Sequence, residues 1–297
     1  MSYIYAYLLF YTSHFDNKLK GNLMLQPHSS HSIIDSTKLQ TYMECPRRFF
    51  YEYVLGWKPD RTSVHLVFGE AWHISMEYLL QNGYSSTSLT KAFELFNSKY
   101  REHFDMSTDE GRKPKTPANA FRGLLEYVLT YNSDSFKVIH TELAGHIYIS
   151  PTRTIVYKTD AVIQKSDERY YILEHKTSAR NERSWLMQWP LKTQLSTYSH
   201  MLYSLVSDYS QFGGVLVNGF FVHNQTKNHK EGEMINDFER INIRKTPQQM
   251  LTWLWEINDW MDSIERDFDR AFSSTPDDST MKAFRKNPQS CTAYGGC

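Results

Sequence analysis

The chain has few cysteines, no net charge and no long apolar run. Its 297 residues include three cysteines, and 33 Lys and Arg side chains balance 33 Asp and Glu side chains. So small and odd a number of cysteines predicts no disulfide framework and favours a reducing, cytoplasmic location. The balanced charge gives no global basic field, so any nucleic-acid binding must depend on local patches. No apolar stretch is long enough to span a bilayer, which predicts no membrane partner.

The N-terminal segment also lacks the features of a secretory signal. Residues 3–11 are apolar and aromatic, but no basic residue precedes them and no small-residue cleavage site follows. Met24 lies shortly before the first helical pattern. We therefore expect residues 1–35 to be an extension, with residues 1–23 upstream of a true start at Met24. The alternative is an extra edge strand or helix packed on the surface.

Apolar periodicity and turn residues predict that helices come first and strands second. Helical spacing and candidate caps predict helices over residues 36–54, 68–82, 88–104 and 117–132. Segments rich in Ile, Val and Tyr predict strands over residues 138–149, 154–163, 169–175, 213–223 and 238–243. Further helices are predicted over residues 190–205 and from residue 246 onward, where Thr246-Pro247 precedes apolar residues at helical spacing.

This order is typical of an α/β fold in which a mixed central sheet is flanked by helices. The chain is long enough to bury a full core, as one large domain or as a domain with an appendage. We divide it into a helical part over about 36–135, a sheet-bearing core over about 136–245, and a C-terminal helix with a cysteine-bearing tail over 246–297.

One predicted strand ends in an acid and a lysine. Glu174-His175-Lys176 closes an apolar run, and Asp160 lies in the preceding strand. Since side chains alternate across a strand, Glu174 and Lys176 point to the same face. Two converging carboxylates can hold Mg²⁺ or Mn²⁺, and a nearby lysine can orient a water or stabilise a phosphate. This is the chemistry of metal-dependent phosphodiester cleavage. The alternative is that these side chains merely cap two strand ends.

Further motifs stand on either side of this triplet. His73 ends a Gly-x-x-x-His pattern on a predicted helix, and Gln194 and Tyr198 share one face of a later helix. Residues 36–49 end in Cys45-Pro46-Arg47-Arg48-Phe49. In this order the motifs resemble the PD-(D/E)XK nuclease superfamily, in particular its RecB-like branch and the CRISPR-associated RecB-like exonucleases with an iron–sulfur cluster. The resemblance covers most of the chain.

The resemblance implies a metal site on a restriction-endonuclease-like core. It assigns Asp160, Glu174 and the backbone carbonyl of His175 as ligands of a catalytic Mg²⁺ or Mn²⁺. Lys176 becomes the catalytic lysine, and His73 is placed at the same metal. An imidazole ligand favours Mn²⁺ over Mg²⁺. Taken by itself, His73 could equally have a structural role, as a lone histidine on a helix usually does.

The resemblance also implies that Gln194 and Tyr198 hold the nucleic-acid strand, since an amide or a phenol can contact phosphate or base. From the residues alone, both could instead border the buried stripe of their helix. The expected function is a metal-dependent DNA nuclease, an exonuclease on single-stranded DNA ends in repair, recombination or phage- and CRISPR-related processing. One alternative is a catalytically weak, nuclease-like DNA-binding or assembly module. Another is a cysteine–metal interaction protein whose acidic triplet is accidental.

The three cysteines bracket the predicted core. The iron–sulfur subset of the family uses one cysteine before the core and three after it; here Cys45 stands before, and Cys291 and Cys297 stand after. A 4Fe–4S cluster takes four thiolates, so the resemblance implies a fourth ligand beyond residue 297. The alternatives are a zinc site completed by a histidine and three unrelated thiols. A shared cluster predicts that Cys45 lies close in space to the other two cysteines.

Overall fold

The computed structural model describes residues 27–179, 183–206, 208–224, 226, 228, 230, 233–273 and 282–291. The described chain divides into two compact units. The first, called here the sheet unit, comprises Ile33–Gln40 and Pro59–Asn258. The second, the terminal unit, draws its described residues from 27–32, Thr41–Lys58, 259–273 and 282–291.

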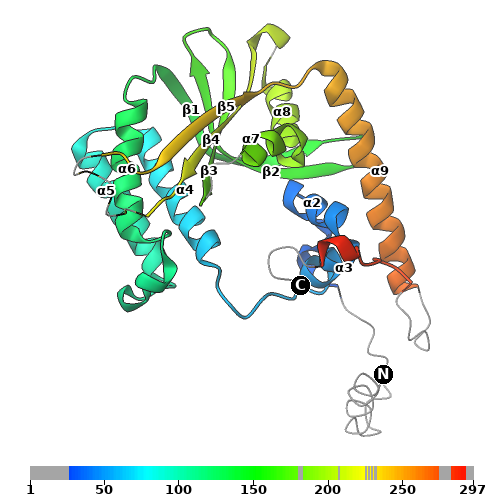
Figure 1. Ribbon diagram of the computed structural model, residues 1–297. Helices are drawn as coiled ribbons and strands as arrows, with labels where there is room; N and C mark the ends of the chain where they lie inside the picture. Colours follow the sequence, from blue (N-terminus) through cyan, green and yellow to red (C-terminus); the bar gives the residue numbers. More distant parts are fainter. Residues whose placement is uncertain are drawn as a thin grey trace, which may run out of the picture. The chain divides into compact units, whose positions relative to one another are not determined.

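The sheet unit is built on a five-stranded mixed sheet. Its strands are β1 (Phe136–Tyr148), β2 (Thr154–Lys165), β3 (Tyr170–Ser178), β4 (Phe212–Phe221) and β5 (Asp237–Ile243). They lie in the order β1-β2-β3-β4-β5, and only β3 and β4 run parallel. A parallel pair needs a crossover, which α7 (Arg183–Gln188) and α8 (Thr193–Leu205) supply. The predicted fold class, a mixed sheet flanked by helices, is confirmed (Figure 1).

The sheet opens between β2 and β3 part-way along both strands. Their pairing runs from Gln164↔Tyr170 to Ala161↔Leu173 and stops there in the described register. Beyond that point β3 continues to pair with β4, and β2 continues to pair with β1. The next residues on the two separating strands are Asp160 and Glu174. The acidic motif therefore lies at the mouth of this opening.

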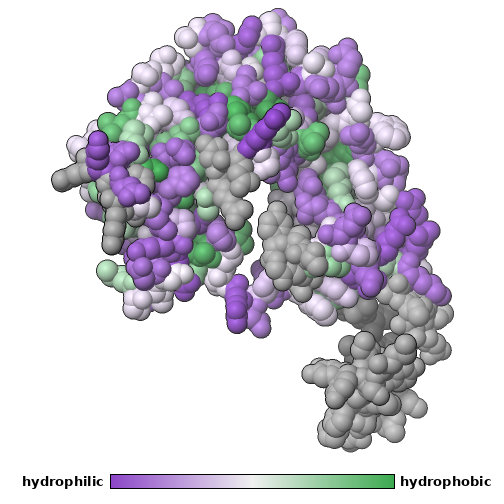
Figure 2. Space-filling model, in the orientation of Figure 1, coloured by the Kyte–Doolittle hydropathy of each residue, from purple (hydrophilic) through white to green (hydrophobic). Residues whose placement is uncertain are grey.

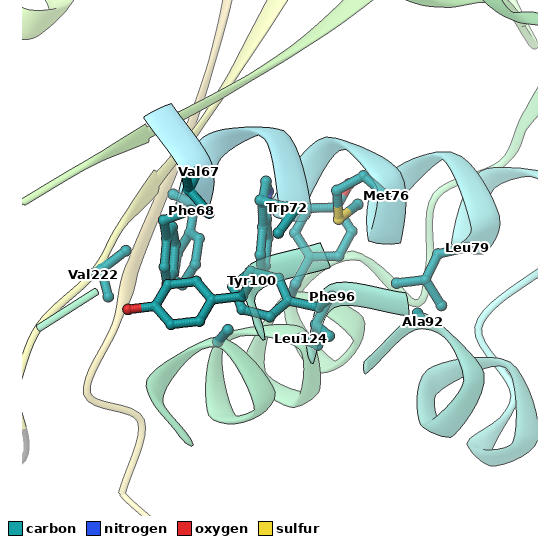
Figure 3. Packing of buried hydrophobic residues seen from close by; sticks show 14 of the residues in the cluster. Val67, Phe68, Trp72, Met76, Leu79, Ala92, Phe96, Tyr100, Leu124 and Val222 are labelled. Atoms are coloured by element: carbon teal, nitrogen blue, oxygen red, sulfur yellow. The ribbon is translucent and has the colours of Figure 1, made fainter. Parts of the chain in front are cut away.

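Three helices cover one face of the sheet: α4 (Val64–Asn82), α5 (Ser86–Arg101) and α6 (Pro117–Tyr131). Figure 3 shows Phe68, Trp72 and Met76 of α4 pointing into the core cluster at four-residue spacing, opposite side chains of α5 and α6. The Trp72 ring lies 4.1 Å from that of Phe220 on β4. This aromatic contact fixes α4 against the sheet and so fixes the position of His73, the next residue.

The opposite face is covered by α7 and α8. Side chains from both helices pack against alternate residues of the strands, and the cluster includes Trp185, Leu195, Val162, Ile172 and Val217. The predicted helix over 190–205 is shorter than expected, because a 3₁₀ turn, η5 (Trp189–Leu191), precedes α8. Helix α7 was not predicted from the sequence. Pro190 interrupts the helical pattern and separates α7 from α8.

The terminal unit contains the break in the first predicted helix. Instead of one helix over 36–54, the chain forms α2 (Ser36–Glu44), α3 (Pro46–Phe49) and a π-helical turn, η2 (Phe50–Val54). Cys45 separates the first two with φ −161 and ψ 104. The physical reason is Pro46, since a proline pushes the residue before it out of the helical region. Within this unit Phe284 packs against Phe49 and Phe50.

The remaining elements are one long helix and several short turns. The predicted C-terminal helix is present as α9 (Pro247–Phe272). Short 3₁₀ turns occur at Ser29–Ser32, Met106–Thr108, Glu110–Arg112, Tyr209–Gln211 and Pro288–Ser290. Figure 2 shows hydrophilic residues spread over the drawn face, with apolar residues in scattered groups. Within the described ranges, no helix combines the length and apolar character needed to cross a bilayer.

Two helical glycines should respond oppositely to alanine. A Cβ at Gly123 would lie 2.2 Å from Cζ of Phe220, whose ring is held by Trp72, whereas a Cβ at Gly69 would meet only Thr177 Oγ1 at 3.7 Å. We expect Gly123→Ala to lower the free energy of unfolding by about 1–3 kcal/mol through overpacking. Gly69→Ala should raise it by about 0.5–1 kcal/mol, because alanine is the better helix former. Urea unfolding measures both, and shifts of the same sign would contradict this packing.

Candidate active site

Asp160 connects β2 to both neighbouring elements at the sheet opening. Its Oδ1 lies 2.8 Å from Nδ1 of His73 on α4, and its Oδ2 accepts a 2.6 Å hydrogen bond from the backbone N–H of His175 on β3. By strand alternation Asp160 shares a face with Val162, which packs on the α7–α8 side. The opening lets its carboxylate reach the α4 side instead. The side chain satisfies a backbone donor of β3 where the pairing of the two strands has ended.

Glu174 lies on the α8 side of the same opening and is almost completely buried. Its side chain is 2% exposed, and its Oε1 accepts hydrogen bonds from Lys176 Nζ at 2.6 Å and Gln194 Nε2 at 2.9 Å. Its other oxygen, Oε2, is buried and has no hydrogen-bond partner. A buried carboxylate oxygen without a partner is costly, because it has lost the water that would solvate it. This atom is therefore suited to accept a cation.

Gln194 and Tyr198 are positioned by one turn of α8. The Gln194 amide donates to the Tyr198 hydroxyl at 2.8 Å as well as to Glu174, and the Tyr198 hydroxyl donates to the backbone carbonyl of Lys158. The Tyr198 side chain is buried, so its ring packs in the core. These contacts hold Glu174 in place. The contact of this pair with a nucleic-acid strand stays a prediction.

The two carboxylates occupy opposite electrostatic environments. Burial alone would raise the pKa of Asp160, but the charge and hydrogen bond of His73 outweigh it and lower the pKa to about 2. Burial, followed by the charge of Asp160, raises the pKa of Glu174. Burial would lower the pKa of Lys176, but the charges of Glu174 and Asp160 raise it overall. The two carboxylates of the site therefore differ, because the pKa of Asp160 is held low while that of Glu174 is raised.

The pKa values of His73 and His175 are shifted in opposite directions, although the centres of the two rings lie only 6.4 Å apart. Burial would lower the pKa of His73, but the charge and hydrogen bond of Asp160 raise it overall. Burial lowers the pKa of His175 to about 3, and its ring lies beside Tyr127 and Asn218 on the α4 side. The His175 imidazole is thus a neutral core group. The proposed role of this residue needs only its backbone carbonyl, and that role stays a prediction.

The donor set at the opening fits a hard divalent cation. In the described part of the chain, no group of three or more His, Cys, Asp and Glu side chains is arranged to hold a metal ion. Asp160 and His73 instead bond to each other, and Glu174 bonds to Lys176. The partnerless Glu174 Oε2 and the ionised Asp160 nevertheless offer the carboxylate oxygens that Mg²⁺ and Mn²⁺ take as ligands. Both residues approach the opening from adjacent strands.

Sequence reasoning missed a lysine close to this site. Lys115, just before α6, is 3% exposed, and its Nζ donates to Thr177 Oγ1 at 3.1 Å. Thr177 directly follows Lys176 on β3. Lys115 lies in a polar segment beside Arg112 and Lys113, and no local pattern marked it as buried. Only the tertiary structure places it beside the strand that carries the motif.

Two of the three cysteines are described, and both contact the same residue of the terminal unit. The Asn287 N–H donates to Cys45 Sγ at 3.4 Å, and Cys291 Sγ donates to the Asn287 carbonyl at 3.4 Å. Residues 45 and 291 are thus brought together from distant parts of the sequence. Both are free thiols, Cys45 buried and Cys291 half-buried. Cys297 lies outside the described residues.

A family model provides the decisive comparison. The model of the PD-(D/E)XK nuclease superfamily matches residues 36–291. No curated protein matches the chain. One matching solved structure, titled "Crystal structure of SSO0001", is 13% identical over 76% of this chain and 82% of that chain, with a TM-score of 0.29, too low for a conclusion about the fold. Because the family model covers most of the sequence, the chain belongs to the PD-(D/E)XK nuclease superfamily.

Proposed function

We propose that this protein is a metal-dependent deoxyribonuclease that hydrolyses phosphodiester bonds, acting as an exonuclease on single-stranded DNA ends. Proteins of its superfamily are usually hydrolytic nucleases that use Mg²⁺ or Mn²⁺. The observation that carries the proposal is the buried Glu174 Oε2 without a partner, beside the ionised Asp160 and the lysine Lys176 at the sheet opening. The motif order further supports the RecB-like branch, with roles in repair, recombination or CRISPR-related processing.

In the proposed hydrolysis each residue of the site has its own role. Asp160 and Glu174 would hold the cation through carboxylate oxygens, and Gln194 keeps Glu174 in its orientation. When bound, the cation supplies Lewis acidity and neutralises negative charge on the phosphate oxygens. Lys176 places an ammonium beside Glu174, where it can stabilise the charge that develops on the phosphate. His73 fixes the Asp160 carboxylate from the α4 side.

The resemblance also implies His73 and the backbone carbonyl of His175 as metal ligands. His73 uses Nδ1 to bond Asp160, so binding a cation through that nitrogen requires this contact to break. His175 would contribute only its backbone carbonyl. We propose that Asp160 and Glu174 would form the primary cation site and that His73 would add an imidazole nitrogen to it. An imidazole in the site would favour Mn²⁺ over Mg²⁺.

The cysteines support a second, structural metal group only in part. A 4Fe–4S cluster takes four thiolates, whereas the sequence contains three cysteines. The contacts of Cys45 and Cys291 with Asn287 bring both thiols to the same part of the terminal unit, which supports a common metal group. We propose that these two thiols, with Cys297, bind iron. The donors within this sequence do not complete a four-thiolate cluster, and the hydrolysis proposed above does not depend on one.

Removal of any member of the acid–acid–lysine set should stop cleavage. We expect Asp160→Ala, Glu174→Ala and Lys176→Ala each to lower the rate on single-stranded DNA by roughly a hundredfold or more in Mn²⁺ or Mg²⁺. Double variants should lose little more, because each change blocks the same step. Single-turnover assays with end-labelled DNA measure these rates. Lys91→Ala, on an exposed face of α5, is the control, and near-normal rates in two of the three singles would refute the assignment.

The metal affinity should follow the hydrogen bonds of Glu174. Calorimetric titration with Mn²⁺ should show binding to the wild type and almost none to Glu174→Gln, which removes the charge that the cation neutralises. Gln194→Ala should bind about 10–100-fold more weakly, because Glu174 loses the partner that orients it. Gln248→Ala, on the exposed first turn of α9, should bind normally. Equal affinities in wild type and Glu174→Gln would exclude this residue as a ligand.

The cysteine proposal is tested by iron content. After anaerobic reconstitution with iron and sulfide, Cys45→Ser and Cys291→Ser should each lose most of the bound iron, because the thiolate is the ligand. Both variants should keep cleavage close to that of the wild type. Elemental analysis and visible absorbance measure the loss. Iron bound equally by the wild type and both variants would show that these cysteines are unrelated thiols.

A further inference from the structure

Lys115 is a buried cation that has no acidic partner. The residue is 3% exposed, and its backbone is held in place because Tyr100 donates a 2.8 Å hydrogen bond to its carbonyl. Its Nζ donates to Thr177 Oγ1 at 3.1 Å and lies 5.2 Å from the Phe68 ring. Within the described ranges, no Asp or Glu forms an ion pair with it. Since an ammonium has three donors, this leaves hydrogen-bonding capacity unused.

This arrangement is unusual for a lysine with a purely structural role. Buried charges in proteins are generally paired, because the loss of solvation is otherwise not compensated. The neighbouring Lys113 follows that rule, since it is 48% exposed and pairs with Glu110. Burial lowers the pKa of Lys115 to about 8, and no carboxylate offsets that effect. An anion brought to this position would supply the missing counter-charge.

Residues on one face of α4 lie between the candidate metal site and Lys115. His65, Gly69 and His73 follow one another at four-residue spacing and so lie on the same side of the helix. His73 contacts Asp160, and Gly69 lies opposite Thr177. Burial and the nearby charge of Lys115 lower the pKa of His65. A polar stripe therefore leads from the candidate metal site to Lys115.

Part of this stripe reaches the surface. His65 is exposed, and Gly69 and Thr177 are only half-buried. Gly69 has no side chain, although a Cβ there would meet Thr177 Oγ1 at an ordinary 3.7 Å, so packing does not require glycine. The missing side chain leaves the Thr177 hydroxyl and the ammonium behind it more accessible. Thr177 follows Lys176 on β3 and points to the opposite face, toward Gly69 of α4.

We propose that Lys115 and Thr177 form a phosphate subsite, which holds the phosphodiester group adjacent to the one being cleaved. This inference rests on the proposed nuclease function. The ligand is a backbone phosphate, because the buried ammonium lacks a negative partner and a phosphate supplies that charge whereas a base does not. Its role is to position the strand, so that the scissile phosphate lies at the sheet opening beside Asp160 and Glu174.

A scan with neutral phosphates tests the subsite directly. Single-stranded oligonucleotides, each with one phosphate replaced by an uncharged methylphosphonate, are assayed for binding and for single-turnover cleavage. In the wild type we expect one position next to the scissile phosphate to lose roughly tenfold in affinity or rate, as for a hydrogen bond to a charged group. Lys115→Met should lose a similar factor on unmodified DNA and lose nothing further at that position.

The salt dependence and a matched control complete this test. The slope of log affinity against log salt concentration should become shallower by about 0.7 in Lys115→Met, the value for one phosphate contact on a single strand. Lys113→Met, two residues away, should keep the wild-type sensitivity at every position. If Lys115→Met also keeps that sensitivity, the subsite is refuted while the nuclease function stands. If the wild type neither binds nor cleaves DNA, both proposals fail.

Thermal unfolding separates this role from a structural one. Removal of a buried charge without an acidic partner should leave the melting temperature of Lys115→Met unchanged or raise it, whereas a structural lysine would lower it. Lys115→Gln retains a donor for Thr177 without the charge and serves as the second variant should Lys115→Met fold poorly. A lower melting temperature with unchanged phosphate sensitivity in either variant would overturn the inference.

Discussion

The end of the pairing between β2 and β3 is the constraint on which the rest of the site depends. Both strands keep their other neighbours, so the sheet remains continuous while a gap forms between its second and third strands. The gap exposes backbone groups that would otherwise pair, and the Asp160 carboxylate satisfies one of them. It also allows His73 of α4 on one face to contact Asp160 and Gln194 of α8 on the other face to contact Glu174. Without that gap both acids would lie on the sheet face that the apolar α7–α8 layer covers.

The two acids have been given different properties by their neighbours. Asp160 lies between an imidazole and a backbone N–H, and the charge and hydrogen bond of the imidazole lower its pKa. Glu174 is more deeply buried, and one of its oxygens has no partner. Lys176 donates a hydrogen bond only to the other oxygen, Oε1. The protein thus keeps a buried carboxylate oxygen without a hydrogen-bond partner in a well-packed region, and a functional role for the site explains why such an atom is kept.

Much of this arrangement could be predicted from the sequence, because strand alternation and helix periodicity are local rules. Alternation placed Glu174 and Lys176 on one face, and four-residue spacing paired Gln194 with Tyr198. The break at Cys45 followed from Pro46 but was overlooked in a longer helical pattern. The sheet opening and the buried Lys115 could not be predicted, because each depends on contacts between elements far apart in the chain. Neither leaves a periodic signal in the residues that form it.

The rigid attachment of α4 has a consequence for how sequence changes spread. The helix presents Trp72 to the core and His73 to Asp160, so two consecutive residues connect aromatic packing with the polar centre. Helix α8 does the same from the other layer, where Leu195 is buried beside Gln194. A change of side-chain volume in either hydrophobic layer would therefore shift His73 or Gln194, and with them the two carboxylates. Substitutions in the core of this protein should thus alter the geometry of the candidate site.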